Sequence, residues 1–161
     1  MDVIEAIGGT PLIELKRVAA GLPVKVFIKC EHLNPGGSVK DRTARAIVLD
    51  AEARGKLGPG ATMIEGTAGN TGVGLALIAS ARGYRCICVL PEKMAVDKRI
   101  QLRQLGSEVI ITRNAPLSNP INFRNVAARM AEENGWFLAN QFRLPLAWWS
   151  ASISHSDDSL S

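Results

Sequence analysis

One lysine in this 161-residue sequence stands where a glycine-rich turn leads into a predicted helix. Residues 34–42 read Asn-Pro-Gly-Gly-Ser-Val-Lys-Asp-Arg. Pro35 fixes its own backbone, and the two glycines that follow it let a ligand approach the main chain closely. Ser38 is a favourable N-cap residue, and Asp41, three residues later, completes a pattern similar to a capping box. The pattern places Lys40 in the first helical turn.

In that turn, the amine of Lys40 lies close to backbone N–H groups and the positive end of the helix dipole. This setting suits a lysine that forms a Schiff base with a carbonyl compound. The alternative for the stretch taken alone is an ordinary solvated lysine beside a turn.

A second glycine-rich loop joins a predicted strand to the most apolar predicted helix. Residues 65–74 read Glu-Gly-Thr-Ala-Gly-Asn-Thr-Gly-Val-Gly. Asn70 or Thr71 can cap the helix, and the N–H groups at its start form an anion site. The spacing matches neither a P-loop nor Gly-x-Gly-x-x-Gly, which disfavours a nucleotide. A small carboxylate is the better ligand, and a tight turn of small residues that pack closely is the alternative interpretation.

The composition is that of a folded globular protein, with 47% hydrophobic and 21% charged residues. The net charge of +4 is spread among acidic residues, and four Phe and one Tyr offer few stacking platforms, so nucleic-acid binding is not expected. Three cysteines at 30, 86 and 88 predict a reducing, cytoplasmic setting and no metal site. The first residues lack a signal-peptide core, and no apolar run approaches the roughly 18 residues of a membrane span.

Strands and helices alternate along most of the chain. Residues 1–23 are expected to be irregular. The predicted strands are 24–29, 62–65, 85–90, 109–112 and 136–139, and the predicted helices run from the Lys40 turn to about 53, then over 70–82, 97–105 and 123–134. From residue 62 onward this alternation predicts an α/β fold with three layers, a parallel sheet with helices on both faces.

Together, the two loops resemble those of the fold-type II pyridoxal-phosphate enzymes, and most closely the cysteine synthase and cystathionine β-synthase group. Four further segments match the same group in the same order, and the resemblance covers residues 1–142. These segments are Gly8-Gly9-Thr10-Pro11-Leu12, Pro91-Glu92-Lys93-Met94, Leu105-Gly106-Ser107-Glu108-Val109 and Asn140-Gln141-Phe142.

The resemblance implies roles for individual residues. Lys40 matches the lysine that binds pyridoxal phosphate covalently and later removes the substrate α-proton. Asn70 matches the residue that hydrogen-bonds the ring hydroxyl of the cofactor. The groups that hold the substrate α-carboxylate match Thr67, Gly69, Thr71 and Gln141. Ala68 departs from the serine common in that loop, which is expected to alter carboxylate binding and not the class of reaction.

The implied reaction is a β-replacement, in which O-acetylserine or a related serine derivative reacts with sulfide to give cysteine. A cystathionine β-synthase reaction, with homocysteine as the nucleophile, stays open. The implied partners are an amino-acid substrate, a second copy of the chain and serine acetyltransferase. A third hypothesis is a non-catalytic module that binds the C-terminal peptide of a serine acetyltransferase.

The resemblance ends after Phe142, where the family continues into a large second domain that carries a Gly/Thr-rich loop for the cofactor phosphate. We therefore expect a truncated chain with three parts and weakened cofactor binding. Residues 1–40 would pack with the missing domain, 41–142 form the small α/β domain, and 143–161 form an aberrant, disordered tail. The strand at Val24–Lys29 is expected to expose an apolar edge and to promote self-association.

Overall fold

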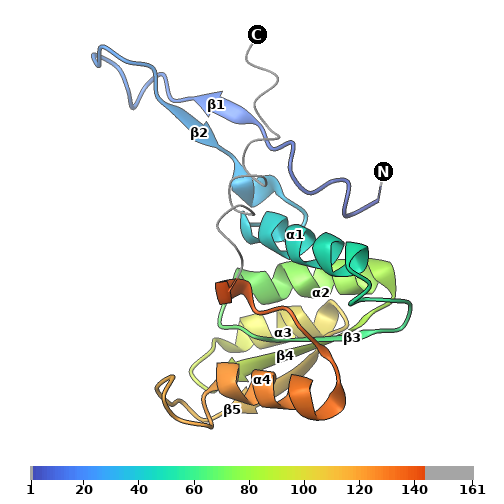
Figure 1. Ribbon diagram of the computed structural model, residues 1–161. Helices are drawn as coiled ribbons and strands as arrows, with labels where there is room; N and C mark the ends of the chain where they lie inside the picture. The colour runs from blue at the N-terminus through green and yellow to red at the C-terminus, as the bar shows by residue number, and fades with distance from the viewer. Residues whose placement is uncertain (1, 144–161) are drawn as a thin grey trace.

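A four-stranded parallel sheet forms the centre of the protein in the computed structural model, which describes residues 2–143 (Figure 1). Its spatial order is β5-β4-β3-β6. The strands are β3 (Thr62–Gly66), β4 (Arg85–Pro91), β5 (Glu108–Thr112) and β6 (Phe137–Leu138). The predicted parallel α/β sheet is thereby confirmed.

Four α-helices surround the sheet in layers (Figure 1). They are α1 (Lys40–Ala53), α2 (Asn70–Arg82), α3 (Val96–Gln104) and α4 (Phe123–Asn134). The chain moves from β3 through β4 to β5 and then returns to the other side of β3. Because right-handed crossovers in opposite directions place their helices on opposite faces, α2 and α3 cover one face and α4 covers the other. Helix α1 packs on α2 as an additional outer layer.

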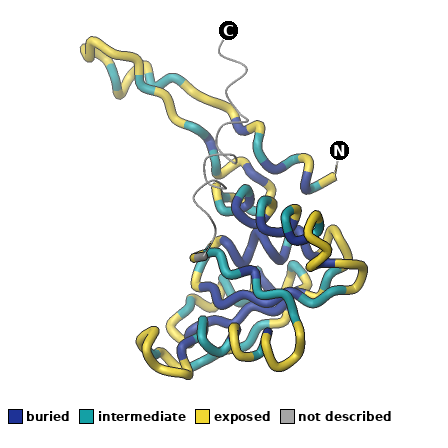
Figure 2. The backbone as a smooth tube through the Cα atoms, in the orientation of Figure 1, coloured by how far each residue is buried: buried dark blue, intermediate teal, exposed yellow. Residues whose placement is uncertain are grey.

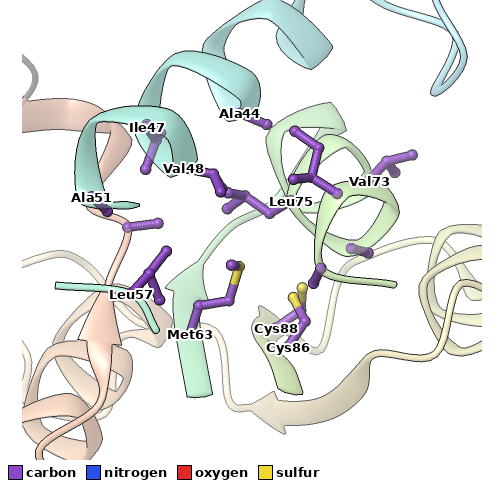
Figure 3. Packing of buried hydrophobic residues seen from close by; sticks show 14 of the residues in the cluster. Ala44, Ile47, Val48, Ala51, Leu57, Met63, Val73, Leu75, Cys86 and Cys88 are labelled. Carbon is purple, nitrogen blue, oxygen red and sulfur yellow. The ribbon is translucent and has the colours of Figure 1, made fainter. Parts of the chain in front are cut away.

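Strand β4 shows how the sheet divides the core. Cys86, Cys88 and Leu90 belong to the cluster under α1 and α2, which Figure 3 shows from close by. Ile87 and Val89, which alternate with them, belong to the cluster under α4. A parallel strand covered on both faces must be apolar on both, and this explains the unbroken apolar run that predicts the strand.

Helix α2 has the bounds predicted from the sequence, but its start differs from the prediction. Gly83 ends the helix in the left-handed conformation, at φ 71°. At the other end the N-cap is Gly69, with no side-chain capping bond. The prediction that Asn70 or Thr71 caps the helix was therefore wrong. Both residues lie inside the first turn, where their side chains contact other segments.

The first 23 residues are more ordered than predicted, because β1 (Leu12–Glu14) pairs antiparallel with β2 (Phe27–Lys29). This hairpin projects from the body of the protein, and most of its surface is exposed (Figure 2). The strand predicted at 24–29 is shorter than expected, and its partner strand was not predicted. The exposed apolar side chains expected at 24–29 are present as Val24, Phe27 and Ile28. Self-association through them stays a prediction.

The structure also has two short 3₁₀ helices. One, η1 (Glu31–Leu33), precedes the turn that leads to Lys40, and the other, η2 (Gln141–Arg143), follows β6. Between residues 2 and 143, no helix combines the length and the apolar character needed to cross a membrane. The expectation of a disordered tail concerns residues that, from 144 onward, lie outside the described part of the chain.

Candidate active site

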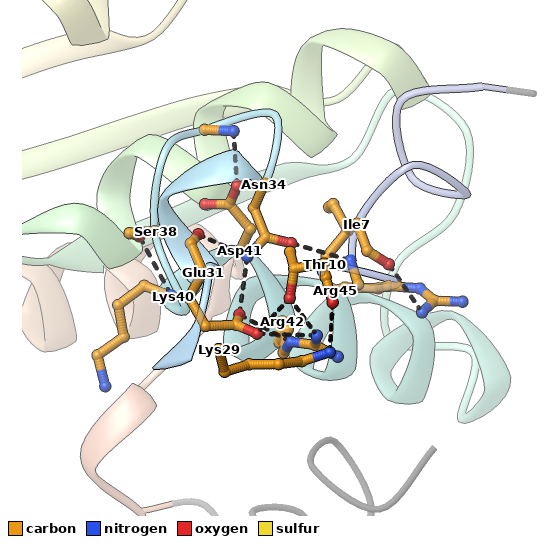
Figure 4. Close-up of polar contacts among 12 residues, drawn as sticks. Ile7, Thr10, Lys29, Glu31, Asn34, Ser38, Lys40, Asp41, Arg42 and Arg45 are labelled. Carbon is orange, nitrogen blue, oxygen red and sulfur yellow. Dashed lines mark hydrogen bonds and ion pairs between the residues drawn. The ribbon is translucent and has the colours of Figure 1, made fainter. Parts of the chain in front are cut away.

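A hydrogen-bonded ion pair holds the turn that precedes Lys40 (Figure 4). Arg42 donates from Nε to Glu31 Oε2 and from Nη2 to Glu31 Oε1, each at 2.9 Å. Thr10 Oγ1 and Asn34 Nδ2 also donate to the Glu31 carboxylate, each at 2.8 Å. Arg42 is the main reason that the pKa of Glu31 falls to about 2. Figure 4 shows the Lys40 side chain extending away from this cluster.

Asp41 closes the same turn in a way that differs from the predicted capping box. Its Oδ2 accepts the Gly36 N–H at 2.5 Å, and not that of Ser38. Ser38 is not the N-cap, which is Val39, but its Oγ accepts the Lys40 N–H at 3.1 Å. Gly36 explains the difference, since a Cβ at that position would lie 2.6 Å from Asp41 Oδ1. The carboxylate occupies the space under the glycine, and burial raises the pKa of Asp41.

The Lys40 turn lies beside the start of α2 because Gly74 lets the two helices approach closely. A Cβ on Gly74 would lie 2.9 Å from Ala44 Cβ and 3.2 Å from the Lys40 carbonyl oxygen. The first turn of α1 thus packs against the second turn of α2. Added Cβ atoms on Gly37 and Gly69, in the two loops, would meet no atom within 4 Å.

The second loop meets the end of β6 at the point where the strand order reverses. Thr71 Oγ1 donates to Gln141 Oε1, and Asn140 N–H donates to Glu65 Oε2 at 2.7 Å. Gln141 lies close to the same carboxylate, and its backbone N–H and side-chain amide partly oppose the rise in the pKa of Glu65. Burial is the largest effect on Glu65 and raises its pKa to about 7. Ligands of parallel α/β sheets bind at such reversal points, beyond the carboxyl ends of the strands.

Asn70, in the first turn of α2, is oriented by a lysine from α3. Lys98 Nζ donates to Asn70 Oδ1 and to Gln101 Oε1, each at 3.0 Å. This contact occupies the acceptor end of the Asn70 amide and turns its donor end, Nδ2, away from Lys98. In the loop before it, the Gly69 N–H donates to the buried Thr67 hydroxyl at 3.3 Å.

The structure therefore brings Thr71 into contact with Gln141, and Thr67 into contact with Gly69, while Lys40 lies at the neighbouring helix start. The roles of the six predicted site residues in binding stay predictions. Glu65 and Lys98 were not identified from the sequence as residues of the site. The only local signal for Glu65 is an acid at the end of an apolar strand, and Lys98 has none. No group of three His, Cys, Asp or Glu side chains within residues 2–143 could hold a metal ion.

Comparison with known proteins gives one family. The family model described as "Pyridoxal-phosphate dependent enzyme" matches residues 3–153. Cystathionine beta-synthase of Rattus norvegicus is 44% identical over 162 residues, which cover 98% of this chain and 28% of the relative. Cysteine synthase of Staphylococcus aureus is 39% identical over 144 residues, which cover 89% of this chain and 46% of the relative.

A solved structure agrees with these relatives. The crystal structure of an O-ureido-L-serine synthase superposes with a TM-score of 0.84 at 39% identity, over 94% of this chain and 49% of that chain. The chain thus spans about half the length, or less, of the relatives it matches.

Proposed function

Because this chain belongs to the pyridoxal-phosphate dependent enzyme family, we propose that it supplies the lysine and the carboxylate loop of a β-replacement enzyme. In this proposal Lys40 binds the cofactor covalently, and Asn70 hydrogen-bonds its ring hydroxyl. The main support is the packing of Gly74 against the first turn of α1. This contact sets the Lys40 turn beside the loop that starts α2.

The residues present are compatible with such a cofactor. An added Cβ on Gly37 or Gly69 would meet no atom within 4 Å, so both loops leave their backbone accessible to a ligand. Lys98 turns the donor end of the Asn70 amide outward, as a hydroxyl or phenolate acceptor requires. When bound, pyridoxal phosphate withdraws electrons from the α-carbon of an amino acid, and the protein supplies orientation and a base.

The residues of the chain would then divide the work on the substrate. The hydroxyl and N–H groups of Thr67, Gly69 and Thr71 hold the α-carboxylate at the positive end of α2, together with the Gln141 amide. Lys40 Nζ takes the proton from the substrate α-carbon. Ala68 offers no side-chain hydroxyl, so backbone N–H groups carry more of the carboxylate binding in this loop.

We further propose O-acetylserine or a related activated serine as the substrate and sulfide as the second reactant, as in a cysteine synthase. The alternative is homocysteine, as in a cystathionine β-synthase. The relatives that support the reaction class carry both names, so they do not choose between the two.

The same proposal covers the domains and partners. Residues 1–40 would pack with a second domain, and 41–142 would form the small domain. The exposed hairpin β1–β2 supports a contact with that domain or with a second copy of the chain. The C-terminal carboxylate of a serine acetyltransferase would bind the same loop as the substrate does. The proposed location of the protein is the cytoplasm. The 161 residues by themselves should bind the cofactor weakly, because their loops provide the lysine side of the site alone.

The test is reductive trapping of the covalent bond between the cofactor and the chain. The full chain is mixed with pyridoxal phosphate, treated with borohydride and digested, and the modified peptide is identified by mass spectrometry. We expect a substoichiometric adduct at Lys40 that is lost in Lys40→Ala. Lys56→Ala, which changes an exposed lysine beyond the end of α1, should leave the adduct unchanged. Equal labelling of several lysines, or an adduct that survives Lys40→Ala, would contradict the proposal.

A further inference from the structure

The side-chain amide of Gln141 lies between two partners of different kinds. On one side its N–H₂ group faces the buried carboxylate of Glu65 and favours the ionised form of that carboxylate. On the other side its Oε1 accepts the Thr71 hydroxyl. Because an amide has one donor end and one acceptor end, the partner at either end decides how the whole group is turned.

Glu65 restricts the orientation of this amide more than Thr71 does. An ionised carboxylate only accepts hydrogen bonds, so it must face the N–H₂ end. A hydroxyl both donates and accepts, so Thr71 tolerates either end. A protonated Glu65 can instead donate its O–H to Oε1, which would turn the N–H₂ group toward Thr71.

We propose that Glu65 is a positioning residue, which sets whether the acceptor or the donor end of the Gln141 amide faces the carboxylate loop. With Glu65 ionised, the amide oxygen points toward Thr71 and opposes an anion there. With Glu65 protonated, the amide N–H₂ points the same way and can bind the anion. The anion is the amino-acid carboxylate only if the proposed function holds, but the turning of the amide does not depend on it.

The surroundings of Glu65 permit such a change near neutral pH. The backbone N–H of Asn140, a residue held at φ 48°, donates to Glu65, and the Gln141 backbone lies nearby, so the segment after β6 stays attached to β3. The facing groups that carry or can carry charge are Arg124 from α4 and the buried thiols Cys86 and Cys88 from β4. A pocket of about 290 Å³ borders Glu65 and gives protons a route from solvent.

With a pKa of about 7, Glu65 is protonated in roughly nine-tenths of molecules at pH 6 and in roughly one-tenth at pH 8. An anion that binds only the protonated form would then bind about tenfold more tightly at pH 6 than at pH 8.

The experiment follows both groups by NMR in the full chain, without ligand. The Glu65 side-chain carbon and the Gln141 side-chain amide are recorded as pH rises from 6 to 8. We expect the two signals to titrate with one midpoint, and contacts from the Gln141 N–H₂ group to the Thr71 methyl group to appear only below it. If the Gln141 signals stay constant while Glu65 titrates, this measurement on the wild-type chain is sufficient to overturn the proposal.

Glu65→Gln supplies the matched variant, since its amide can donate to Gln141 Oε1 at every pH. Its Gln141 signals should resemble the wild-type signals at pH 6 and show no midpoint. A retained midpoint in this variant would also overturn the proposal.

A ligand arm separates this inference from the proposed function. L-serine is titrated into both proteins at pH 6 and pH 8, and we expect about tenfold tighter binding at pH 6 in the wild-type chain and no pH effect in Glu65→Gln. If the amide turns with pH but L-serine does not bind, the amino-acid site is wrong and the role of Glu65 stands. If L-serine binds equally at both pH values in the wild-type chain, Glu65 does not control the site.

Discussion

Replacing Arg42 by alanine should destabilise the turn that presents Lys40. The Arg42 and Glu31 side chains are 11% and 20% exposed, so most of the ion pair is shielded from water. Removing Arg42 leaves the Glu31 carboxylate in that shielded position with only Thr10 and Asn34 as donors. Breaking one side of a buried ion pair costs more than the pair itself contributes, because the remaining charge has lost its hydration.

The pKa of Glu31 gives the size of the effect. In the folded protein it is lowered from 4.5 to about 2, an interval that corresponds to about 3 kcal/mol. Because the carboxylate is one-fifth exposed, solvent screening reduces the expected loss to about 2 kcal/mol. Since the folded pKa lies below the unfolded one, this stability is present above pH 4.5 and is lost as the pH falls toward 2.

The assay is urea unfolding followed by circular dichroism at several pH values. At pH 7, Arg42→Ala should unfold with about 2 kcal/mol less free energy than the wild-type chain, and this gap should narrow below pH 4. Arg54→Ala removes an ion pair with Asp50 whose arginine is 55% exposed, and it should cost less than about 0.5 kcal/mol. Equal stability of Arg42→Ala and the wild-type chain at pH 7, or a gap that is independent of pH, would refute the reasoning.

Two further substitutions test the packing behind the site. Gly74→Ala should push the first turn of α1 away from α2, because the new Cβ would lie 3.2 Å from the Lys40 carbonyl oxygen; we expect a loss of about 1–3 kcal/mol and less cofactor adduct. Gly58→Ala, where a Cβ meets nothing within 4 Å, is the control, and equal behaviour of the two variants would contradict the contact. Leu102→Ala, at a fully buried position, should cost about 2–5 kcal/mol in urea unfolding. Ile100→Ala, on the same helix but 44% exposed, should cost much less, and the reverse order would contradict the assignment of the buried face of α3.

The sequence predicts the parallel sheet and its helices because their signals are local. Buried strands show continuous apolar runs, and Gly83 and Gly135 stop α2 and α4 in the left-handed conformation that glycine favours. Strand β1 lacks such a signal. Its pairing joins Leu12 to Lys29 across a long connection, without the two-residue turn that marks a tight hairpin.

The residues of the candidate site also divide into those with a local signal in the sequence and those that depend on contacts distant in the sequence. The two loops are recognisable in the sequence because their glycines and polar residues lie close together along the chain. The sequence gives Glu65 one weak signal and Lys98 none, because their contacts depend on β6 lying next to β3 and on α3 starting near α2. Asp41 was correctly singled out but given the wrong partner, since the choice between Ser38 and Gly36 depends on the course of the turn.

The burial of all three thiols provides internal reporters of local opening. Cys30 follows β2, next to the turn that leads to Lys40, whereas Cys86 and Cys88 lie in the centre of the sheet. A thiol reagent can label each of them only when its surroundings open. The labelling rates of these positions would therefore show whether the segment that carries the lysine opens on its own or only when the sheet unfolds, without any engineered probe.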